Sequence, residues 1–534
     1  MSEIQQSIQI PPAVKPEWYE LPDDFLNEEG FIPRMDHEFK KIFNNGTDPE
    51  KIKDELNYVF LSILNSDLDE KYISAAHIIM LSVLCDFAQK YKREATYKNI
   101  LDCINNPEYA EICRKYYFHK ALIVYGKAYF MVYQHAKSLN NSIGNLDLLM
   151  VAKANLWKAY LLHIEGKVQY GIQTITECLS LLSMCMADLS RWDEGMHYLN
   201  VAARTKDNNP NITYAKVLLL DAFRDKTCNG YNTYLLKKII DFSEETINGG
   251  LAMPEQITQL NGFIDACKKQ IATKDITLQK LNEHDKKVAK ISAEHDAYTT
   301  FCLDNGLFLN EHSIFCRCND ATVDSIKIQT EHKHTEVEKA ILMEPIVNTL
   351  VADFIHARKN LFDSMDVSVF SSFHKNDLRR INIDFDLQSA MLRNAFKNMY
   401  GILDKIARGI LQVMNQKIGD EERIYFNSIW SKFQDIDYKN FYLTSLRSIH
   451  LDLGYVPEAA LQDFKRLRNE IEHKLLVVVR DKSEIESMPE FVTMAITKDE
   501  LFEKTKILMQ LTKSAIHSFV YLVRRQTKLE EKSN

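Results

Sequence analysis

The sequence predicts an all-α protein, and three observations support this fold class. The chain of 534 residues has only 16 glycines and 12 prolines, which is about half of average usage. Apolar residues recur at helical spacing over most of its length. The composition, 46% hydrophobic and 26% charged, is that of a globular protein with a large core. We therefore expect β structure only within about 303–330 and in the run Leu475–Val479.

The N-terminal part reads as a lead-in segment over 1–50 followed by successive amphipathic helices over 51–250. Prolines punctuate the lead-in, as is typical of irregular chain. The segment Ser183–Pro210 resembles a tetratricopeptide repeat, with Ala187 at a tight helix contact and Arg191–Glu194 opening the second helix. Gly195 stands where alanine is usual. We expect degenerate tetratricopeptide-like repeats over 51–250, with a plain helical bundle as the alternative.

A connecting segment is expected over 251–297, because residues 254–300 look like one long polar helix. Two Glu-His-Asp tripeptides lie in it, centred on His284 and His295. Their spacing of 11 residues places both histidines on one helix face, about 16 Å apart. That separation is too large for the two side chains to share a metal ion. The pattern therefore favours a solvated, charged connecting helix.

A set of potential metal ligands follows this segment. It comprises Cys302, His312, Cys316, Cys318, His332 and His334. In structural zinc sites, two to four residues usually separate the two cysteines of a pair, and a second matched pair of ligands completes the site. Here a single residue separates the two nearest cysteines. We therefore expect buried cysteines and surface histidines, with no metal site and no cofactor.

Charge and motif content exclude several function classes. The net charge is −8, so any nucleic-acid contact must be local rather than a broad basic surface. The sequence has no secretory signal and no stretch of 18 apolar residues, and its ten cysteines are scattered; these features predict a cytoplasmic protein without membrane spans. We find no P-loop, G-x-G-x-x-G, H-E-x-x-H or G-x-S-x-G motif.

After residue 300, helices are expected near 336–363, 386–417, 421–434, 440–450, 457–478 and 498–527. The helix expected at 457–478 carries the strongest indication of function. Pro457 suits its first turn. Its apolar stripe is made of Phe464, Leu467, Ile471 and Leu475. On a helical wheel, Arg468 falls inside that stripe. His473 lies about 140° from Arg468, on the side shared by Asn469. An Arg468–Glu472 pair would explain the glutamate but not an arginine at a buried edge.

The motif Arg468-Asn469-Glu470-Ile471-Glu472-His473 resembles the R-x4-6-H signature of the HEPN superfamily (higher eukaryotes and prokaryotes nucleotide-binding). Further segments resemble a bacterial branch of that superfamily with helical repeats in front: Phe301–Asn310, Ala352–Phe362, Ser389–Ile406, Asn427–Trp430 and Arg468–Leu475. The resemblance covers about 298–520, and we expect a HEPN domain over 298–527. One departure is Asn310-Glu311-His312, where that branch continues with asparagine, proline and leucine.

The resemblance implies a metal-independent endoribonuclease that acts on RNA as a homodimer. His473 would exchange protons with the ribose 2′-hydroxyl or the leaving 5′-oxygen. Arg468 would hold the scissile phosphate, and Asn469 would orient either group. Because one straight helix separates Arg468 from His473, a second copy is expected to complete the cleft.

The same resemblance points to prokaryotic defence, in antiphage, abortive-infection or toxin–antitoxin systems. The helical repeats would then act as a sensor or regulator that receives a protein partner or trigger. A different class of function remains open: a catalytically inactive HEPN scaffold that serves as a dimerisation or nucleotide-binding module. Retention of Arg468, Asn469 and His473 favours the active enzyme.

Overall fold

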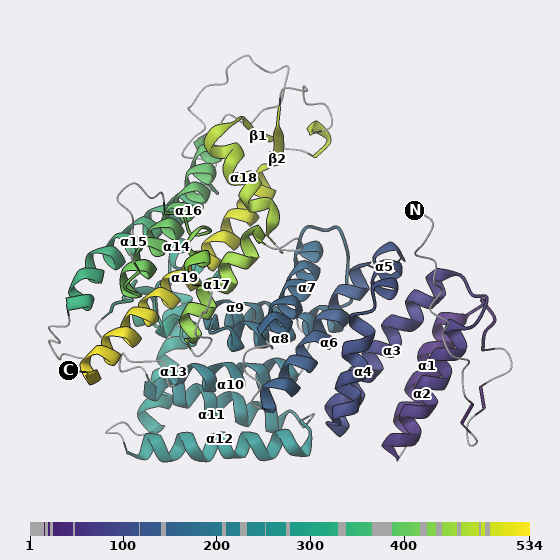
Figure 1. Ribbon diagram of the computed structural model, residues 1–534. Helices are drawn as coiled ribbons and strands as arrows, with labels where there is room; N and C mark the ends of the chain where they lie inside the picture. Colours follow the sequence, from purple (N-terminus) through teal and green to yellow (C-terminus); the bar gives the residue numbers. More distant parts are fainter. Residues whose placement is uncertain are drawn as a thin grey trace. The chain divides into compact units, whose positions relative to one another are not determined.

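A computed structural model gives the arrangement of the chain (Figure 1). It describes residues 15–16, 20–21, 25–45, 48–116, 118–139, 146–205, 210–224, 232–250, 252–273, 278–328, 338–365, 387–416, 424–433, 440–455, 461–479, 482–485 and 492–533. These residues form an all-α protein, as predicted, with one short pair of strands. They divide into two compact units, Met1–Tyr170 and Gly171–Asn534.

The described residues of the first unit form a bundle of seven helices. They are α1 (Phe31–Asn45), α2 (Pro49–Leu64), α3 (Glu70–Tyr91), α4 (Glu94–Ile104), α5 (Pro107–Tyr116), α6 (Phe118–Ser138) and α7 (Leu146–Ile164). Aspartates cap two of them: Asp48 accepts the Glu50 N–H and Asp69 the Lys71 N–H, each satisfying a free N-terminal amide. The buried faces of α1 to α6 share one apolar core. Helix α1 therefore places part of the expected lead-in segment inside a folded unit.

The second unit begins with six further helices. They are α8 (Ile172–Asp188), α9 (Trp192–Ala203), α10 (Pro210–Arg224), α11 (Asn232–Asn248), α12 (Pro254–Ala272) and α13 (Leu278–Ala293). Neighbours in sequence pack together, α8 on α9, α10 on α11 and α11 on α12. A Cβ atom on Gly195 would lie 2.7 Å from Leu219 Cδ1 and 3.1 Å from the Ser183 carbonyl oxygen. The glycine in place of the usual alanine thus permits a closer helix contact.

The expectation of one long polar helix over 254–300 is wrong. Helices α12 and α13 are separate, residues 294–296 are not helical, and α14 (Ala297–Asp304) starts beyond them. Asp296 caps α14 through the Thr299 N–H, at 2.6 Å. Capping side chains compete with a continuing helix, so this aspartate starts a new element. The expected domain boundaries at 50, 250 and 297 remain predictions.

The rest of the second unit is a helical bundle around α19. Its elements are η1 (His312–Ile314), η2 (Asn319–Thr322), α15 (Glu338–Asp363), α16 (Leu387–Val413), η4 (Ile429–Lys432), α17 (Phe441–His450), η5 (Leu451–Tyr455), α18 (Gln462–His473), β1 (Leu476–Val479), η6 (Lys482–Glu484), β2 (Met494–Thr497) and α19 (Lys498–Ser533). Helix α19 packs on α15, α16 and α17, and also on α9. In Figure 1 the yellow α19 runs beside the green α15 and α16. Much of this helix is therefore buried.

Three local expectations need correction. Of the helix expected at 421–434, the structure describes 424–433, which form a turn followed by the 3₁₀ turn η4. The helix expected at 457–478 begins at Gln462 and ends at His473, while Pro457 lies outside the described residues. The run Leu476–Val479 is a strand, as expected, but it pairs in parallel with Met494–Thr497, which the sequence did not indicate. Within the described part of 303–330 there are 3₁₀ turns and no strand.

The segment that follows α14 is held by one buried arginine of α15. Gly306 adopts φ +63° directly after the helix, a conformation that glycine allows. Arg358 donates to the Leu307 carbonyl at 2.8 Å and to both carboxylate oxygens of Asp324 at 2.8 and 2.6 Å. Asp324 in turn accepts the Leu309 N–H at 2.8 Å. Two of the segments that resemble HEPN proteins, Phe301–Asn310 and Ala352–Phe362, are therefore in direct contact.

We expect Gly409→Ala to destabilise the second unit. A Cβ atom there would lie 2.3 Å from Phe519 Cζ, and this ring is fully buried in α19. Overpacking of this kind costs about 1–3 kcal/mol. Gly401 lies on the same helix and has no neighbour within 4 Å of a Cβ atom. Gly401→Ala should stabilise by about 0.5–1 kcal/mol, through helix propensity alone. Urea unfolding of both variants measures the difference, and equal midpoints would contradict this packing.

Two described helices are long and apolar enough to cross a membrane, Glu70–Tyr91 and Ala340–Asp363. Their most apolar windows are 67% and 33% buried within the fold. Helices of soluble proteins pass the same length and composition test, so these two are weak evidence for membrane insertion. The cysteines of the described residues are all free of disulfides.

Candidate functional site

The motif residues predicted from the sequence lie in the second half of α18. Phe464 packs on Phe396 of α16, with ring centroids 5.6 Å apart, and Leu467 is fully buried beside it. On the opposite flank, Asp463 pairs with Lys504 of α19 at 2.6 Å. These contacts fix α18 against both α16 and α19. The stripe expected along the helix ends early, because Leu475 lies past its end and is 45% exposed.

Arg468 has the partners that its place at the apolar edge required. Its guanidinium carbon lies 4.9 Å from the centre of the Tyr400 ring. Its Nη2 is 3.3 Å from Asp404 Oδ2, and its Nε is 3.3 Å from Glu472 Oε2. The side chain is 22% exposed, so it is partly accessible to solvent. Contacts with two carboxylates and an aromatic ring fix the orientation of this guanidinium, which favours binding of an anionic ligand.

Asp404 was not indicated by the sequence, and it sets the position of the arginine. Its carboxylate accepts the Phe426 N–H at 2.8 Å as well as the contact from Arg468. Burial raises the pKa of Asp404, and the lowering effects of the Phe426 N–H and of Arg468 only partly offset it. Tyr400 and Asp404 lie four residues apart on α16, on one face. The sequence could have indicated that Tyr400 and Asp404 share a helix face. It could not have indicated that this face meets Arg468, because the two segments are far apart in the chain.

His473 is the last residue of α18, and its side chain is 72% exposed. Its Nε2 lies 3.6 Å from Glu472 Oε2, the same oxygen that Arg468 contacts. The wheel separation predicted that one helix could not bring this pair together. No direct contact between the two is seen among the described interactions, but both lie next to Glu472. Asn469 is exposed. A single chain therefore presents Arg468, Glu472 and His473 near one another.

The end of α18 is fixed by Glu470 and by the strand that follows. The buried Glu470 carboxylate accepts from Thr493 Oγ1 and from Lys474 Nζ. The hydrogen bond from Thr493 and the interaction with Lys474 hold the pKa of Glu470 below its usual range. The chain then enters β1, whose four residues are all buried. The helix stops at His473 because the next residues pair with β2, which leaves the imidazole at the helix terminus.

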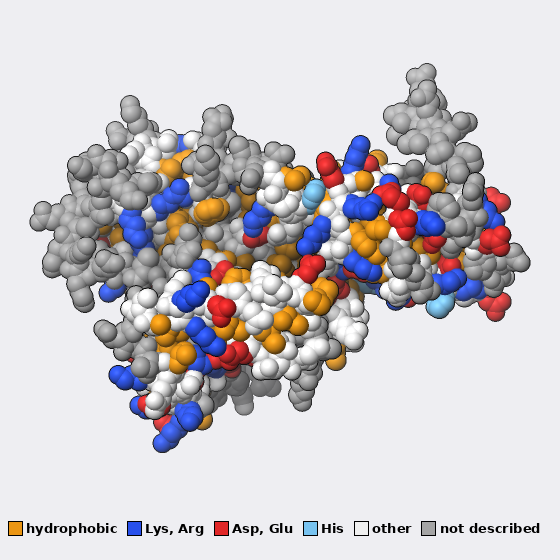
Figure 2. All heavy atoms as spheres, turned by 90° about the horizontal axis from the view of Figure 1, so that it is seen from below, with side chains coloured by type: hydrophobic (Ala, Val, Ile, Leu, Met, Phe, Trp, Pro, Cys, Tyr) orange, Lys and Arg blue, Asp and Glu red, His pale blue; other side chains and the backbone are white. Residues whose placement is uncertain are grey.

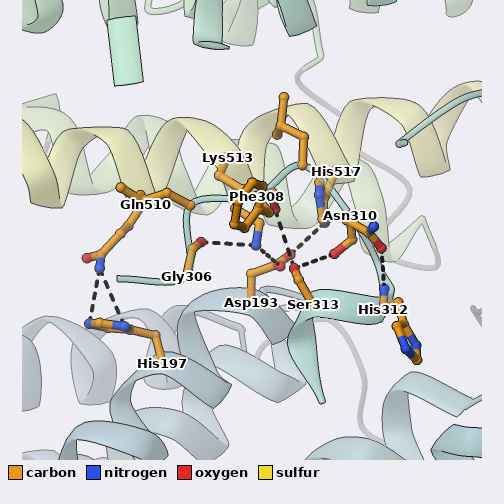
Figure 3. A network of polar contacts seen from close by, with 12 residues as sticks. Asp193, His197, Gly306, Phe308, Asn310, His312, Ser313, Gln510, Lys513 and His517 are labelled. Atoms are coloured by element: carbon orange, nitrogen blue, oxygen red, sulfur yellow. Dashed lines mark hydrogen bonds and ion pairs between the residues drawn. The ribbon is translucent and has the colours of Figure 1, made fainter. Parts of the chain in front are cut away.

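The opening of α9 docks onto the bundle through buried charges, and Figure 3 shows part of this contact. Asp193 lies 2.8 Å from Lys513 Nζ and 2.7 Å from His517 Nδ1, both on α19. Burial by itself raises the pKa of Asp193, but the adjacent His517 and Lys513 outweigh it and hold the pKa well below its usual value. His197 contacts Gln510 one turn further along. The repeat-like helix is thus an integral part of the second unit.

Arg191 makes a second such contact, closer to α18. Its guanidinium is fully buried between Glu194, at 2.6 Å, and Asp452 of η5. It also donates to Ser448 Oγ at 3.2 Å. The Asp452 carbonyl accepts the N–H of Leu461, the residue just before α18. A chain of hydrogen bonds therefore runs from the start of α9 to the start of the motif helix.

Comparison with known proteins identifies the C-terminal part of the chain. Residues 334–526 match the family model described as LA2681-like HEPN. No curated protein matches the chain, and no solved structure does. The second unit thus contains a HEPN domain, as the motif led us to expect. Within that superfamily, its match is to the LA2681-like family.

Proposed function

We propose that this protein is a metal-independent endoribonuclease of the HEPN type. The observation that carries the proposal is the cluster at the end of α18, where Arg468 and His473 both contact Glu472 and His473 is open to solvent. A HEPN domain supports either a ribonuclease or a nucleotide-binding module. An exposed imidazole beside an oriented guanidinium favours the ribonuclease.

In the proposed reaction, His473 takes the proton from a ribose 2′-hydroxyl, and the 2′-oxygen attacks the adjacent phosphorus. The bond from phosphorus to the 5′-oxygen breaks, and the protonated His473 passes its proton to that leaving oxygen, which returns the imidazole to its neutral form. The products are a 2′,3′-cyclic phosphate and a 5′-hydroxyl end. Arg468 stabilises the charge on the phosphate oxygens. To do so, its guanidinium must release Glu472, whose place the phosphate takes. Asn469 is placed to donate to the same phosphate.

The substrate contact is local in this proposal. Figure 2 shows the face away from α18, and there the Lys and Arg side chains are interspersed with Asp and Glu. This agrees with the net charge of −8. Binding would then depend on a few contacts at the site rather than on counterion release over a large area. We propose a homodimer in which the exposed ends of two α18 helices, with Asn469 and His473, form one cleft.

The helical N-terminal region is proposed to sense a partner or trigger and to regulate the nuclease, in a prokaryotic defence system and in the cytoplasm. The buried contacts of Asp193 and Arg191 with the HEPN bundle support a mechanical connection. The second candidate is an inactive scaffold. One observation favours it: Arg468 already has two carboxylate partners and an aromatic one, as a purely structural arginine would.

We expect the purified full chain to cut RNA in the presence of EDTA, because the described part of the chain shows no set of metal ligands at the motif residues. The assay uses a short oligoribonucleotide, with analysis of the product ends. A matched oligonucleotide with 2′-deoxyribose at the cut site should remain intact, since it lacks the nucleophile. Cleavage that is lost in EDTA and restored by magnesium would contradict the mechanism.

Light scattering on the same sample tests the assembly. A dimer at micromolar concentration is expected. A monomer that still cuts RNA would show that the site is complete within one chain, and it would rule out the shared cleft. Absence of cleavage by a well-folded dimer, with or without metal ions, would favour the scaffold.

A further inference from the structure

A cluster of four metal-binding side chains lies outside the HEPN motif, between α13 and the segment that joins η1 to η2. His284, His312, Cys316 and Cys318 each offer one ligand atom, and the four atoms lie within 4.8 Å of one another. His312 Nε2 is 3.2 Å from Cys318 Sγ, and His284 Nε2 is 3.7 Å from Cys316 Sγ. His312 and both cysteines are buried, and His284 is half-buried.

These distances fit one tetrahedral ion. Zinc–nitrogen bonds of about 2.0–2.1 Å and zinc–sulfur bonds of about 2.3 Å place neighbouring nitrogen and sulfur ligands about 3.5 Å apart. The two observed nitrogen–sulfur distances lie on either side of that value. All four ligand atoms lie within 4.8 Å of one another, so a single ion between them could contact each one. A two-iron cluster of the Rieske type would instead place both histidines on one iron and both cysteines on the other.

The fold builds this arrangement with side chains that do not themselves bind the ion. Asn310 closes the segment: its Nδ2 donates to the Asp320 and Val323 carbonyls at 2.6 and 2.7 Å, and its Oδ1 accepts the His312 N–H at 2.7 Å. The Tyr234 ring of α11 packs on His284, with centroids 4.4 Å apart, and on His312, at 5.8 Å. Orienting contacts around ligands are characteristic of built metal sites.

The local core is otherwise small. Cys316, Cys318 and Ala321 form a cluster of buried residues, and the partly buried apolar residues that pack against it, among those the structure describes, are Val288 and Phe315. A segment that buries so few apolar side chains gains little from the hydrophobic effect. A metal ion is a common means of fixing such a segment, since binding to the folded arrangement adds directly to its stability.

We propose that His284, His312, Cys316 and Cys318 bind one zinc ion and thereby fasten α13 to the segment 310–323. Two nitrogen and two sulfur ligands in a tetrahedron favour zinc among the common metals. The four protein ligands leave no open position, so the site is structural rather than catalytic. It shares no residue with the α18 cluster, and the proposal does not rest on the ribonuclease activity.

The local sequence pattern did not predict this site. Cys316 and Cys318 are separated by one residue and have no second matched pair nearby. The fourth ligand, His284, lies in a different segment, where its only apparent counterpart was His295. Of the other potential ligands named from the sequence, Cys302 is buried outside the cluster. There its thiol interacts with Arg358 and Tyr298. His332 and His334 lie outside the described residues.

The first test is the metal content of the full chain, purified without a histidine tag and measured by elemental mass spectrometry. One zinc per chain is expected for the wild type, and near-complete loss for Cys318→Ser and for His284→Ala. Cys302→Ser and His356→Ala are the matched controls, since both residues lie outside the cluster, and they should keep the ion. Wild-type protein with no more zinc than the double variant Cys316→Ser/Cys318→Ser would overturn the proposal.

A second measurement does not depend on variants that fold. Wild-type protein stripped with a strong chelator should melt at a lower temperature, and added zinc should restore the original melting temperature. Reloading with cobalt should give the intense visible absorption of a tetrahedral site with sulfur ligands. A weak spectrum typical of six-coordinate cobalt, or a melting temperature that is indifferent to chelation and zinc, would overturn the proposal.

Discussion

His473→Ala is expected to give a folded protein that no longer cuts RNA. The imidazole is 72% exposed, lies at the last position of α18, and has Glu472 as its contact in this structure. Its removal therefore costs little packing, and the melting temperature should stay close to that of the wild type. Loss of a general acid–base group lowers the rate by about 10²–10⁴-fold. A gel assay with the oligoribonucleotide, together with a thermal melt, measures both effects.

His356→Ala is the matched control. His356 is an exposed histidine of α15, and it contacts Asn360 four residues away. This variant should cut RNA at the wild-type rate. If His473→Ala keeps near wild-type cleavage, the catalytic assignment fails. If it unfolds instead, His473 is structural and the scaffold candidate gains. In cells, growth arrest by the wild type but not by His473→Ala would link cleavage to toxicity.

Arg468→Ala should also abolish cleavage, but with a change in stability. Its removal leaves Asp404 and Glu472 without their shared cation and exposes the Tyr400 ring. Arg468→Lys retains the charge but loses the planar fork that matches a phosphate. We expect the lysine variant to restore most of the stability and little of the activity. Equal recovery of both would indicate that the arginine acts only in folding.

Arg191→Met is expected to destabilise the second unit by about 3–5 kcal/mol, because it leaves two buried carboxylates without a counter-charge. Glu194 and Asp452 are each 3% exposed, and Arg191 contacts both. Methionine has a similar length and apolar character, so the change removes charge with little loss of volume. Urea unfolding gives the shift in midpoint.

Arg204→Met is the control for this effect. Arg204 follows the end of α9, is 54% exposed and pairs with the partly exposed Asp304 at 3.3 Å. Surface pairs of this kind contribute about 0–1 kcal/mol, so its unfolding midpoint should barely move. Similar midpoints for the two variants would show that the buried charges of α9 do not hold it to the HEPN bundle.

The position of the motif helix could be predicted from local pattern. Helical periodicity placed Phe464 and Leu467 on a buried face, and both are buried. The same periodicity placed Arg468 at the edge of that face and so required a partner for it. The partner predicted within the helix, Glu472, is in contact. Such expectations succeed because residues three and four apart on a helix are neighbours whatever surrounds them.

The partners that come from elsewhere in the chain could not be predicted in this way. Asp404 lies 64 residues before Arg468, and only the packing of α16 against α18 brings them together. The end of α18 at His473 depends on the pairing of β1 with β2, in which Leu476 lies beside Met494, 18 residues further along the chain.

The sequence by itself determined that this protein is helical and that Arg468, Asn469 and His473 share one helix, and it led us to expect a HEPN domain near the C-terminus. These properties follow from the spacing of residues along a few turns. Only the tertiary structure decided that Asp404 would meet Arg468, that Arg191 would be buried against Asp452, and that His284 would meet Cys316. The physical reason is that a contact between distant segments depends on how whole helices pack, and the local pattern of either segment carries no record of its partner.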